Sequence, residues 1–285
     1  MLDVAAAIMN GVGTSWQVGL EALLRVAFVQ WPDGLIPSSP EWKQIALSIE
    51  DASPDLLVTN QLPFGNWVAG SPRYDEKIAA ESIDIHDQGI KALHDLDLPA
   101  VITSRPVWSD GRLANEGVVL EGRCLRYLHR KLVLPDQEGW REKTWFQPGR
   151  GGPLLADVLG IRVGVLLCTE LMFNEFARHL GGDGAELIVV PRATDAASPC
   201  VTAGAMAAIV SGSYVVSSNR IGRAGNNPEF GGPGFAFAPD GGLMATTSAD
   251  EHVVVVEIDA RIARRQKCRY PCYLAEGGKL EAALG

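Results

Sequence analysis

The sequence predicts an α/β fold built in layers, and two patterns carry this prediction. Short apolar segments rich in β-branched residues recur along the 285-residue chain, which is typical of strands covered on both faces. Segments of helical periodicity alternate with them in the first half, and a strand-rich stretch follows. Because 47% of the residues are hydrophobic, the chain can bury a large core, as one domain or as two fused halves.

Ten segments fit strands, because each is short, apolar and bounded by turn residues. They are residues 24–30, 55–60, 100–104, 117–120, 123–130, 161–167, 186–191, 214–218, 234–238 and 252–258. Four segments fit helices, at 40–51, 74–96, 173–180 and 201–212. In the second of these helices we expect Ile78, Ser82, Ile85 and Gly89 to lie on one face.

The formal net charge of −9 argues against a nucleic-acid surface and against binding to an anionic membrane. The simpler alternative is that this charge only keeps the protein soluble. The N-terminus has no basic segment followed by an apolar one, and no run approaches roughly 18 apolar residues. We therefore expect neither a signal peptide nor a membrane span.

The five cysteines are odd in number and scattered, which favours reduced thiols in the cytoplasm over a disulfide framework. Cys268 and Cys272 are the only close pair, and without a His or a second pair nearby their spacing is a poor zinc signature. The glycine-rich segments at 149–153 and 230–234 lack the spacing of a P-loop or a dinucleotide motif. We therefore expect a cytoplasmic protein with no metal and no nucleotide cofactor.

Cys168 is the strongest candidate for a chemical role. It ends an apolar run at 162–168, and the chain then continues into a segment that fits a helix. A thiol at such a junction lies near free backbone N–H groups, which favour the thiolate and stabilise an oxyanion when the sulfur attacks a carbonyl or nitrile carbon. The alternative is a buried cysteine with only a structural role.

Three segments each carry a short motif, and the three motifs are specific only in combination. In order, they are an Arg-Lys pair, a Glu before a Pro-Gly turn, and a Cys-x-Glu followed by Phe-x-Glu and Arg. They lie at residues 129–132, 142–149 and 164–178. In this combination the chain resembles the nitrilase superfamily of carbon–nitrogen hydrolases. Weaker similarity extends the resemblance over roughly residues 24–260, at 25–30, 184–191, 214–220 and 239–242.

The resemblance implies a single-domain α/β fold, a four-layer α-β-β-α sandwich. A hydrolase domain at 21–265 would follow an N-terminal extension at 1–20 and precede a C-terminal tail at 266–285. Members of this superfamily are usually homo-oligomers. We therefore expect a homodimer or a larger homo-oligomer, with the extension and the tail as candidate contacts.

The resemblance also implies a Glu–Lys–Cys site. Cys168 would be the nucleophile and would form a thioester or thioimidate. Lys131 and the backbone N–H of Thr169 would stabilise the oxyanion, and the ammonium group would lower the thiol pKa. Glu142 would orient the lysine and take part in acid/base chemistry. Considered alone, Lys131 would fit a solvated strand-end lysine and Glu142 a charge on a loop surface.

The position of the superfamily's general-base Glu is occupied by Gln61, just after the predicted strand at 55–60. Gln has nearly the shape of Glu but cannot take up a proton at neutral pH. Three explanations are open: an engineered Glu-to-Gln replacement, a natural pseudoenzyme that binds substrate with little turnover, or another carboxylate, such as Glu142, acting as the base. We favour the first, since the other motif positions are kept.

Four side chains near these segments are candidates for substrate binding. Phe64, Trp67 and Trp145 would wall a pocket for an apolar or aromatic acyl group, or would equally serve ordinary packing or a dimer contact. Arg192 would receive a substrate carboxylate, or would pair with a neighbour such as Asp195.

The reaction that fits best is hydrolysis of a small non-peptide amide to an acid and ammonia or an amine. Hydrolysis of a nitrile or of an N-carbamoyl compound uses the same machinery in relatives, and a ligand-binding pseudoenzyme is the non-enzymatic alternative. The segment at 168–170 lacks the aromatic residue that follows the cysteine in the nitrilase branch, so we expect an amidase.

Overall fold

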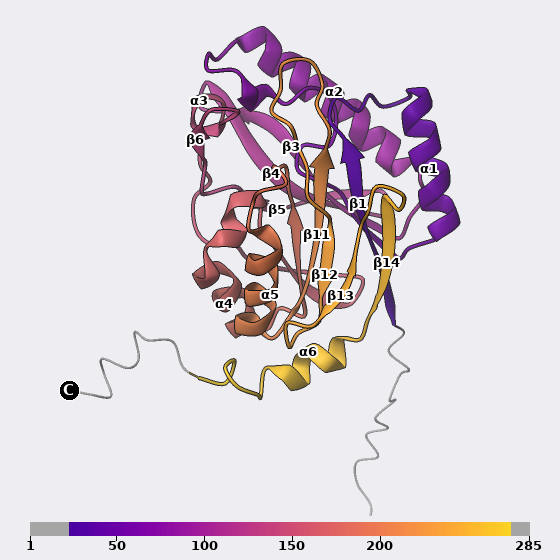
Figure 1. Cartoon of the computed structure of the whole chain (residues 1–285), viewed down its shortest axis with the longest axis vertical. Coiled ribbons are helices and arrows are strands. Elements are labelled where there is room, and N and C mark those ends of the chain that lie inside the picture. The colour runs from indigo at the N-terminus through magenta and orange to yellow at the C-terminus, as the bar shows by residue number, and fades with distance from the viewer. Residues whose placement is uncertain (1–22, 275–285) are drawn as a thin grey trace, which may run out of the picture.

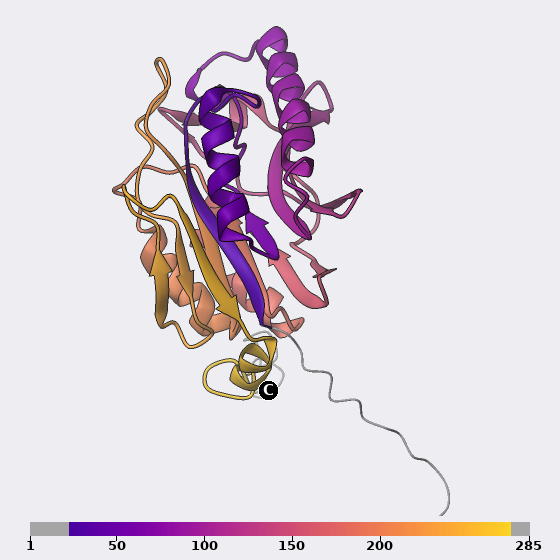
Figure 2. The same cartoon turned by 90° about the vertical axis from the view of Figure 1, so that its right-hand side faces the viewer.

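The computed structural model describes residues 23–274. Its strands and helices follow the predicted alternation, and Figures 1 and 2 show the longer helices on the two outer sides of the strands. The predicted extension at 1–20 lies outside the described residues, as do positions 275–285 of the predicted tail.

Strand β1 (Leu24–Pro32) joins the two halves of the structure. Its first part pairs in parallel with β2 (Leu56–Val58) and antiparallel with β14 (Val253–Ile258). Its end, from Gln30 onward, pairs in parallel with β11 (Tyr214–Ile221). The order of paired strands is β5-β4-β3-β2-β1-β11-β10-β9-β8, so β1 is the point where one sheet passes into the other.

The other elements complete these two sheets and their covers. The first sheet continues through β3 (Ala100–Ser109), β4 (Arg112–Glu121) and β5 (Cys124–Arg130). The second contains β8 (Leu155–Val158), β9 (Ile161–Val165), β10 (Leu187–Pro191), β12 (Phe235–Phe237) and β13 (Leu243–Thr246). The helices are α1 (Pro40–Ala52), α2 (Glu76–His94), α4 (Asn174–Gly182), α5 (Cys200–Ser211) and α6 (Ala260–Gln266). Short elements in the connections are η1 (Val68–Gly70), β6 (Asp136–Gln137), β7 (Trp140–Arg141), α3 (Glu142–Trp145) and η2 (Cys168–Met172).

Three apolar cores separate four layers. In β1, Val26 belongs to the core between the two sheets, whereas the next residue, Ala27, packs with side chains of α1 and α2. In β10, Val189 joins the central core and Val190 packs with side chains of α4 and α5. Successive residues of a strand point to opposite faces, so both sheets are covered on both sides. This arrangement confirms the predicted α-β-β-α sandwich.

All ten predicted strands and all four predicted helices are present, although β3 and β4 form a longer hairpin than expected. Eight further elements were not predicted, namely β8, β13, the β6–β7 pair, α3, α6 and the two 3₁₀ turns η1 and η2. They are short, and β6 and β13 are largely exposed, so they lack the apolar periodicity on which the prediction relied. Within residues 23–274, every helix is too short or too polar to cross a lipid bilayer.

The buried face of α2 differs from the predicted one. Ser82 and Gly89 are buried, but Ile78 is 41% exposed and His86 points inward. His86 can be buried because its Nδ1 atom lies 2.7 Å from the carbonyl oxygen of Ser82, a local hydrogen bond that a hydropathy pattern does not reveal. Gly89 allows close packing, since a Cβ atom there would lie 2.1 Å from the ring of Phe64.

His86 should make the stability of the fold depend on pH. Burial lowers the pKa of His86 to about 4, from its ordinary value of 6.5. Between these values the unfolded chain binds a proton that the folded chain does not. Stability therefore falls as the pH falls through this window, by up to roughly 3 kcal/mol. We expect the free energy of unfolding, measured with urea from pH 7 to 4, to depend less on pH in His86→Gln than in the unaltered chain. An equal dependence on pH in the two proteins would contradict this role of His86.

Candidate active site

Cys168 lies in a sharp turn after strand β9. It is the first residue of η2, is 3% exposed and has a φ of +54°. This left-handed conformation costs a non-glycine residue about 1–2 kcal/mol, so neighbouring groups must hold it. The predicted junction between strand and α-helix is instead this 3₁₀ turn, and α4 begins only at Asn174.

The carboxylate of Glu170 holds this turn. It is completely buried and accepts hydrogen bonds from the backbone N–H groups of Leu167, at 2.7 Å, and of Leu132, at 2.6 Å. His129 Nε2 lies 2.9 and 3.0 Å from its two oxygen atoms. One side chain thus ties the turn after β9, in the second sheet, to the end of β5, in the first.

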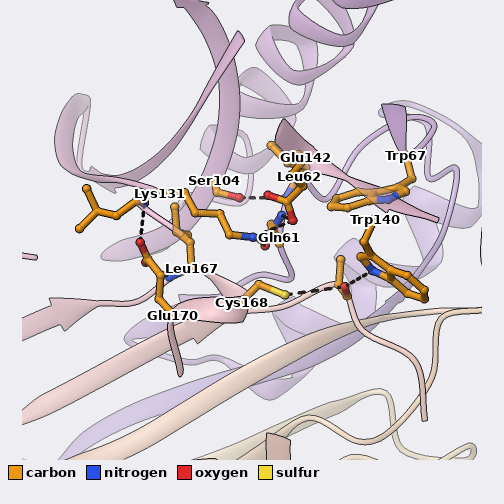
Figure 3. A network of polar contacts seen from close by, with 12 residues as sticks. Gln61, Leu62, Trp67, Ser104, Lys131, Trp140, Glu142, Leu167, Cys168 and Glu170 are labelled. Carbon is orange, nitrogen blue, oxygen red and sulfur yellow. Dashed lines mark hydrogen bonds and ion pairs between the residues drawn. The ribbon is translucent and has the colours of Figure 1, made fainter. Parts of the chain in front are cut away.

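Lys131, Glu142 and Gln61 form a buried polar cluster, and Figure 3 shows the sulfur of Cys168 beside it. The ammonium group of Lys131 donates to Glu142 Oε1 at 2.7 Å and to Gln61 Oε1 at 3.2 Å. The amide nitrogen of Gln61 lies 3.4 Å from Glu142 Oε1. The amide therefore turns its oxygen to the cation and its NH₂ to the carboxylate. Glu142 Oε2 is buried without a hydrogen-bond partner among residues 23–274.

Burial and charge act in opposite directions on these groups. Burial lowers the pKa of Lys131, but Glu142 and the other acidic groups outweigh burial, so the pKa is raised and the side chain carries a positive charge. Burial raises the pKa of the Cys168 thiol, and Lys131 opposes this effect without cancelling it. The ammonium group thus lowers the thiol pKa as expected, but burial outweighs it and the pKa is raised overall. Cys168 stays a thiol until an acceptor takes its proton.

Arg220, from β11, holds the loop that carries Gln61. Its guanidinium group is completely buried, pairs with Asp33 and donates to the carbonyl oxygen of Leu62. From β3, Ser104 Oγ accepts the backbone N–H of Leu62 at 2.8 Å. Neither Arg220 nor Ser104 was predicted as a site residue. For Arg220, the sequence offered one signal, a charged residue near the end of an otherwise apolar strand.

A cavity of about 160 Å³ opens over Cys168. It is small beside the roughly 300–1,000 Å³ of ordinary ligand pockets. In its wall, the carbonyl oxygen of Ala193 accepts hydrogen bonds from Trp140 Nε1 at 3.0 Å and from the Cys168 thiol at 3.7 Å (Figure 3). The remaining wall residues are Pro135, Gln137, Thr169, Met172, Thr194, Asp195, Ser198 and Cys200.

The three predicted aromatic residues lie outside the lining of this cavity and fit the alternative of ordinary packing. Phe64 packs in the core beneath α1 and α2. The indole N–H groups of Trp67 and Trp145 donate to backbone carbonyl groups, both at 2.9 Å. These large side chains find their polar partners inside the fold and are at most 2% exposed. The aromatic residue that lines the cavity is Trp140, from the connection after β5.

Arg192 does not line the cavity either, and its contacts do not include the predicted role with a substrate carboxylate. It is 2% exposed and donates to Ser217 Oγ at 2.6 Å, to Thr194 Oγ1 at 3.0 Å and to the carbonyl oxygen of Pro233 at 2.5 Å. All three guanidinium nitrogens are thus engaged by neutral oxygens. The alternative pairing with Asp195 is not among these contacts.

This arrangement suits covalent chemistry by a thiol. A thiol, a fixed ammonium group and a buried carboxylate lie together below a small cavity, an arrangement that can support attack by sulfur on a polarised carbon. No cluster of three or more His, Cys, Asp or Glu side chains that could hold a metal ion occurs in the part of the chain that the structure describes. All five cysteines are free thiols.

A family model for carbon–nitrogen hydrolases matches residues 88–267, more than half of the chain. The chain belongs to the carbon–nitrogen hydrolase family. The matched range of this carbon–nitrogen hydrolase contains Lys131, Glu142 and Cys168, whereas Gln61 precedes it.

Solved structures share its fold. The carbon–nitrogen hydrolase from Helicobacter pylori G27 matches with a TM-score of 0.80 over 92% of this chain and 98% of its own, at 19% sequence identity. An amidase from Nesterenkonia sp. matches with a TM-score of 0.71 over 92% of this chain and 96% of its own, also at 19% identity.

Curated relatives are more similar in sequence but are matched in part. The nitrilase of Pyrococcus abyssi is 30% identical over 54% of this chain and 57% of its own length. The N-carbamoylputrescine amidase of Solanum tuberosum is 31% identical over 45% of this chain and 48% of its own, so the chain spans about half the length of these two relatives. An (R)-stereoselective amidase of Pseudomonas sp. is 28% identical over 76% of this chain and 78% of its own.

Glu170 should matter for the stability of the whole fold. Glu170→Ala leaves two backbone N–H groups and His129 without their buried acceptor, and each unmet donor costs about 1–3 kcal/mol. We expect the free energy of unfolding to drop by at least about 3 kcal/mol, measured by urea unfolding. The matched control Glu175→Ala, at an exposed position of α4, should cost less than about 1 kcal/mol. Equal effects would show that the carboxylate does not hold the turn.

Proposed function

We propose that this carbon–nitrogen hydrolase cleaves the amide bond of a small non-peptide molecule through a thioester on Cys168. The observation that carries the proposal is the buried cluster in which Lys131 contacts both Glu142 and Gln61, beside a thiol that lines a cavity. A fixed ammonium group and a carboxylate next to a nucleophile serve acyl transfer. Family membership supports the reaction class.

In the proposed acylation, the thiol proton passes to Glu142, whose Oε2 atom has no hydrogen-bond partner within residues 23–274. The sulfur bonds to the carbonyl carbon, and the carbonyl electrons move to its oxygen. Lys131 and the backbone N–H of Thr169 stabilise this oxyanion. As it collapses, the carbon–nitrogen bond breaks, and the nitrogen takes the proton and leaves as ammonia or an amine.

Gln61 makes the second half of the reaction slow in this proposal. Hydrolysis of the thioester needs a group that removes a proton from the attacking water, and an amide cannot do so at neutral pH. We interpret Gln61 as a replacement in an otherwise intact enzyme, with Glu142 as the residual base. A Glu-to-Gln mutant of the Nesterenkonia sp. AN1 amidase carries the acetamide moiety of fluoroacetamide on its active-site cysteine, which supports a cysteine that still attacks carbon when Gln replaces the Glu.

A small amide is the substrate class that we favour. The cavity of about 160 Å³ accepts only a small molecule, and Thr169 stands where the nitrilase branch has an aromatic residue. The names of the relatives include a nitrilase, an (R)-stereoselective amidase and N-carbamoylputrescine amidases. A substrate screen should therefore contain amides, nitriles and N-carbamoyl compounds side by side.

A carboxylate at position 61 should raise turnover. In Gln61→Glu the new group would face Lys131, and Glu142, 3.4 Å from the present amide nitrogen, would raise its pKa toward that of an effective base. We expect release of ammonia from small amides to rise about 10²–10⁴-fold. Gln61→Met, of similar length but without charge, is the control and should not exceed the unaltered chain. No gain in Gln61→Glu would contradict the proposed impairment.

A binding protein without turnover is the second candidate function, and the uncharged Gln61 is the observation that favours it. Intact-protein mass spectrometry separates the two. Under the enzymatic proposal, amides should add an acyl mass to the unaltered chain but not to Cys168→Ala. Stabilisation by the same amides in thermal unfolding, without an adduct and without ammonia from Gln61→Glu, would identify a binder.

We also propose a cytoplasmic homo-oligomer. The five free thiols favour a reducing compartment. Helix α5 carries no charged side chain and exposes Val201 and Met206, at 38% and 43%, which is typical of a surface that another subunit covers. The predicted terminal segments, most of which lie outside the described residues, stay candidate contacts beside this surface.

The contact through α5 predicts a change of mass in solution. Sedimentation equilibrium should give a multiple of the 30.5 kDa chain mass, and Met206→Glu should shift the protein toward the monomer, because the new charge would be buried in the interface. Leu243→Glu, an equally drastic change at a 58% exposed position of β13, should keep the oligomer. A monomeric unaltered chain would refute the contact.

A further inference from the structure

The cavity over Cys168 contains one carboxylate and no cationic side chain in its described lining. The carboxylate is that of Asp195, which is half-buried. Its Oδ1 atom accepts the backbone N–H of Ala197 at 3.0 Å. This local turn fixes the direction of the carboxylate in the wall.

The nearest cations do not cancel this charge at the surface that a ligand meets. Lys131 lies behind Cys168 and is matched by Glu142 at 2.7 Å. Arg192 is buried behind Thr194 and is bonded to neutral oxygens. Neither of these two side chains lines the cavity.

Asp195 also lies close to the reacting sulfur. The carbonyl oxygen of Ala193, two residues earlier, is 3.7 Å from the Cys168 sulfur, and two residues of chain span at most about 7 Å. Asp136 and Glu138, the neighbours of Gln137, do not line the cavity, and Asp136 pairs with Arg141 at 3.9 Å, so Asp195 is the charge that a ligand meets in the described lining. The net charge of −9 acts in the same direction at longer range.

We propose that Asp195 makes the cavity select small amides that carry a protonated amine and disfavour amides that carry a carboxylate. The inference rests on the proposed function for the reaction at Cys168. An ammonium group a few bonds from the scissile amide would gain the attraction of Asp195, whereas an anionic group there would be repelled.

Alkylation of Cys168 tests the charge of the cavity without requiring turnover. Iodoacetamide is neutral and iodoacetate is anionic, and in both reactions the sulfur bonds to the methylene carbon while iodide leaves. Peptide mapping gives the rate at each cysteine. The exposed Cys124 is an internal reference, because it lies outside the cavity in the same molecule.

In Asp195→Asn, the iodoacetate-to-iodoacetamide rate ratio at Cys168 should rise about tenfold, while the ratio at Cys124 should not change. Asn keeps the side-chain oxygen that accepts the backbone N–H of Ala197, so the turn is retained. Asp250→Asn, at an exposed position between β13 and β14, removes the same charge elsewhere and should leave both ratios unchanged. A ratio at Cys168 that stays within about twofold in Asp195→Asn would overturn the inference.

Amide hydrolysis then separates this inference from the proposed function. With Gln61→Glu, 4-aminobutanamide should be cleaved about tenfold faster than its uncharged isostere pentanamide, and glutaramate more slowly than both. The added change Asp195→Asn should reduce these differences. Cleavage of all three at equal rates would refute the selection by Asp195 alone. Cleavage of none, with the expected alkylation ratios, would refute the hydrolase proposal alone.

Discussion

The geometry of the site depends on the buried carboxylate of Glu170. The proposed nucleophile follows a strand of the second sheet and the proposed cation follows a strand of the first, so neither sheet alone sets their relative position. Glu170 accepts backbone N–H groups from both connections and also contacts His129. Because the carboxylate and His129 are buried, loss of the carboxylate would leave donors unmet, and these contacts hold the left-handed conformation of Cys168.

The charges beside the thiol balance one another. Lys131 and Glu142 are completely buried, and such a pair is tolerated only if each charge stays matched and hydrogen-bonded. Gln61 fits this balance, since its amide satisfies both partners and leaves the net charge of the cluster at zero. A carboxylate at this position would add a buried negative charge while supplying a proton acceptor. Chemistry and stability therefore make opposing demands on one side chain.

The cavity is assembled from connections rather than from regular elements. The wall residues Trp140, Thr169 and Asp195 come from three loops that are distant in the sequence. Phe64 and Trp145, each three residues from a residue of the polar cluster, serve the core instead, because the fold can bury them completely. Selectivity toward charged substrates can thus change with a single loop residue while the sandwich and its polar cluster stay the same.

The sequence by itself determined the order of the main strands and helices and the covered faces of the sheets, because apolar periodicity involves residues close together in the chain. It also determined the residues proposed for chemistry, because they belong to short local motifs. Cys168, Lys131, Glu142 and Gln61 all stand in local motifs of the sequence. Only the tertiary structure decided which side chains line the cavity and that burial raises the thiol pKa. It also decided that the guanidinium group of Arg192 donates hydrogen bonds to neutral oxygen atoms within the fold. These properties depend on contacts between segments far apart in sequence, which a local pattern does not encode.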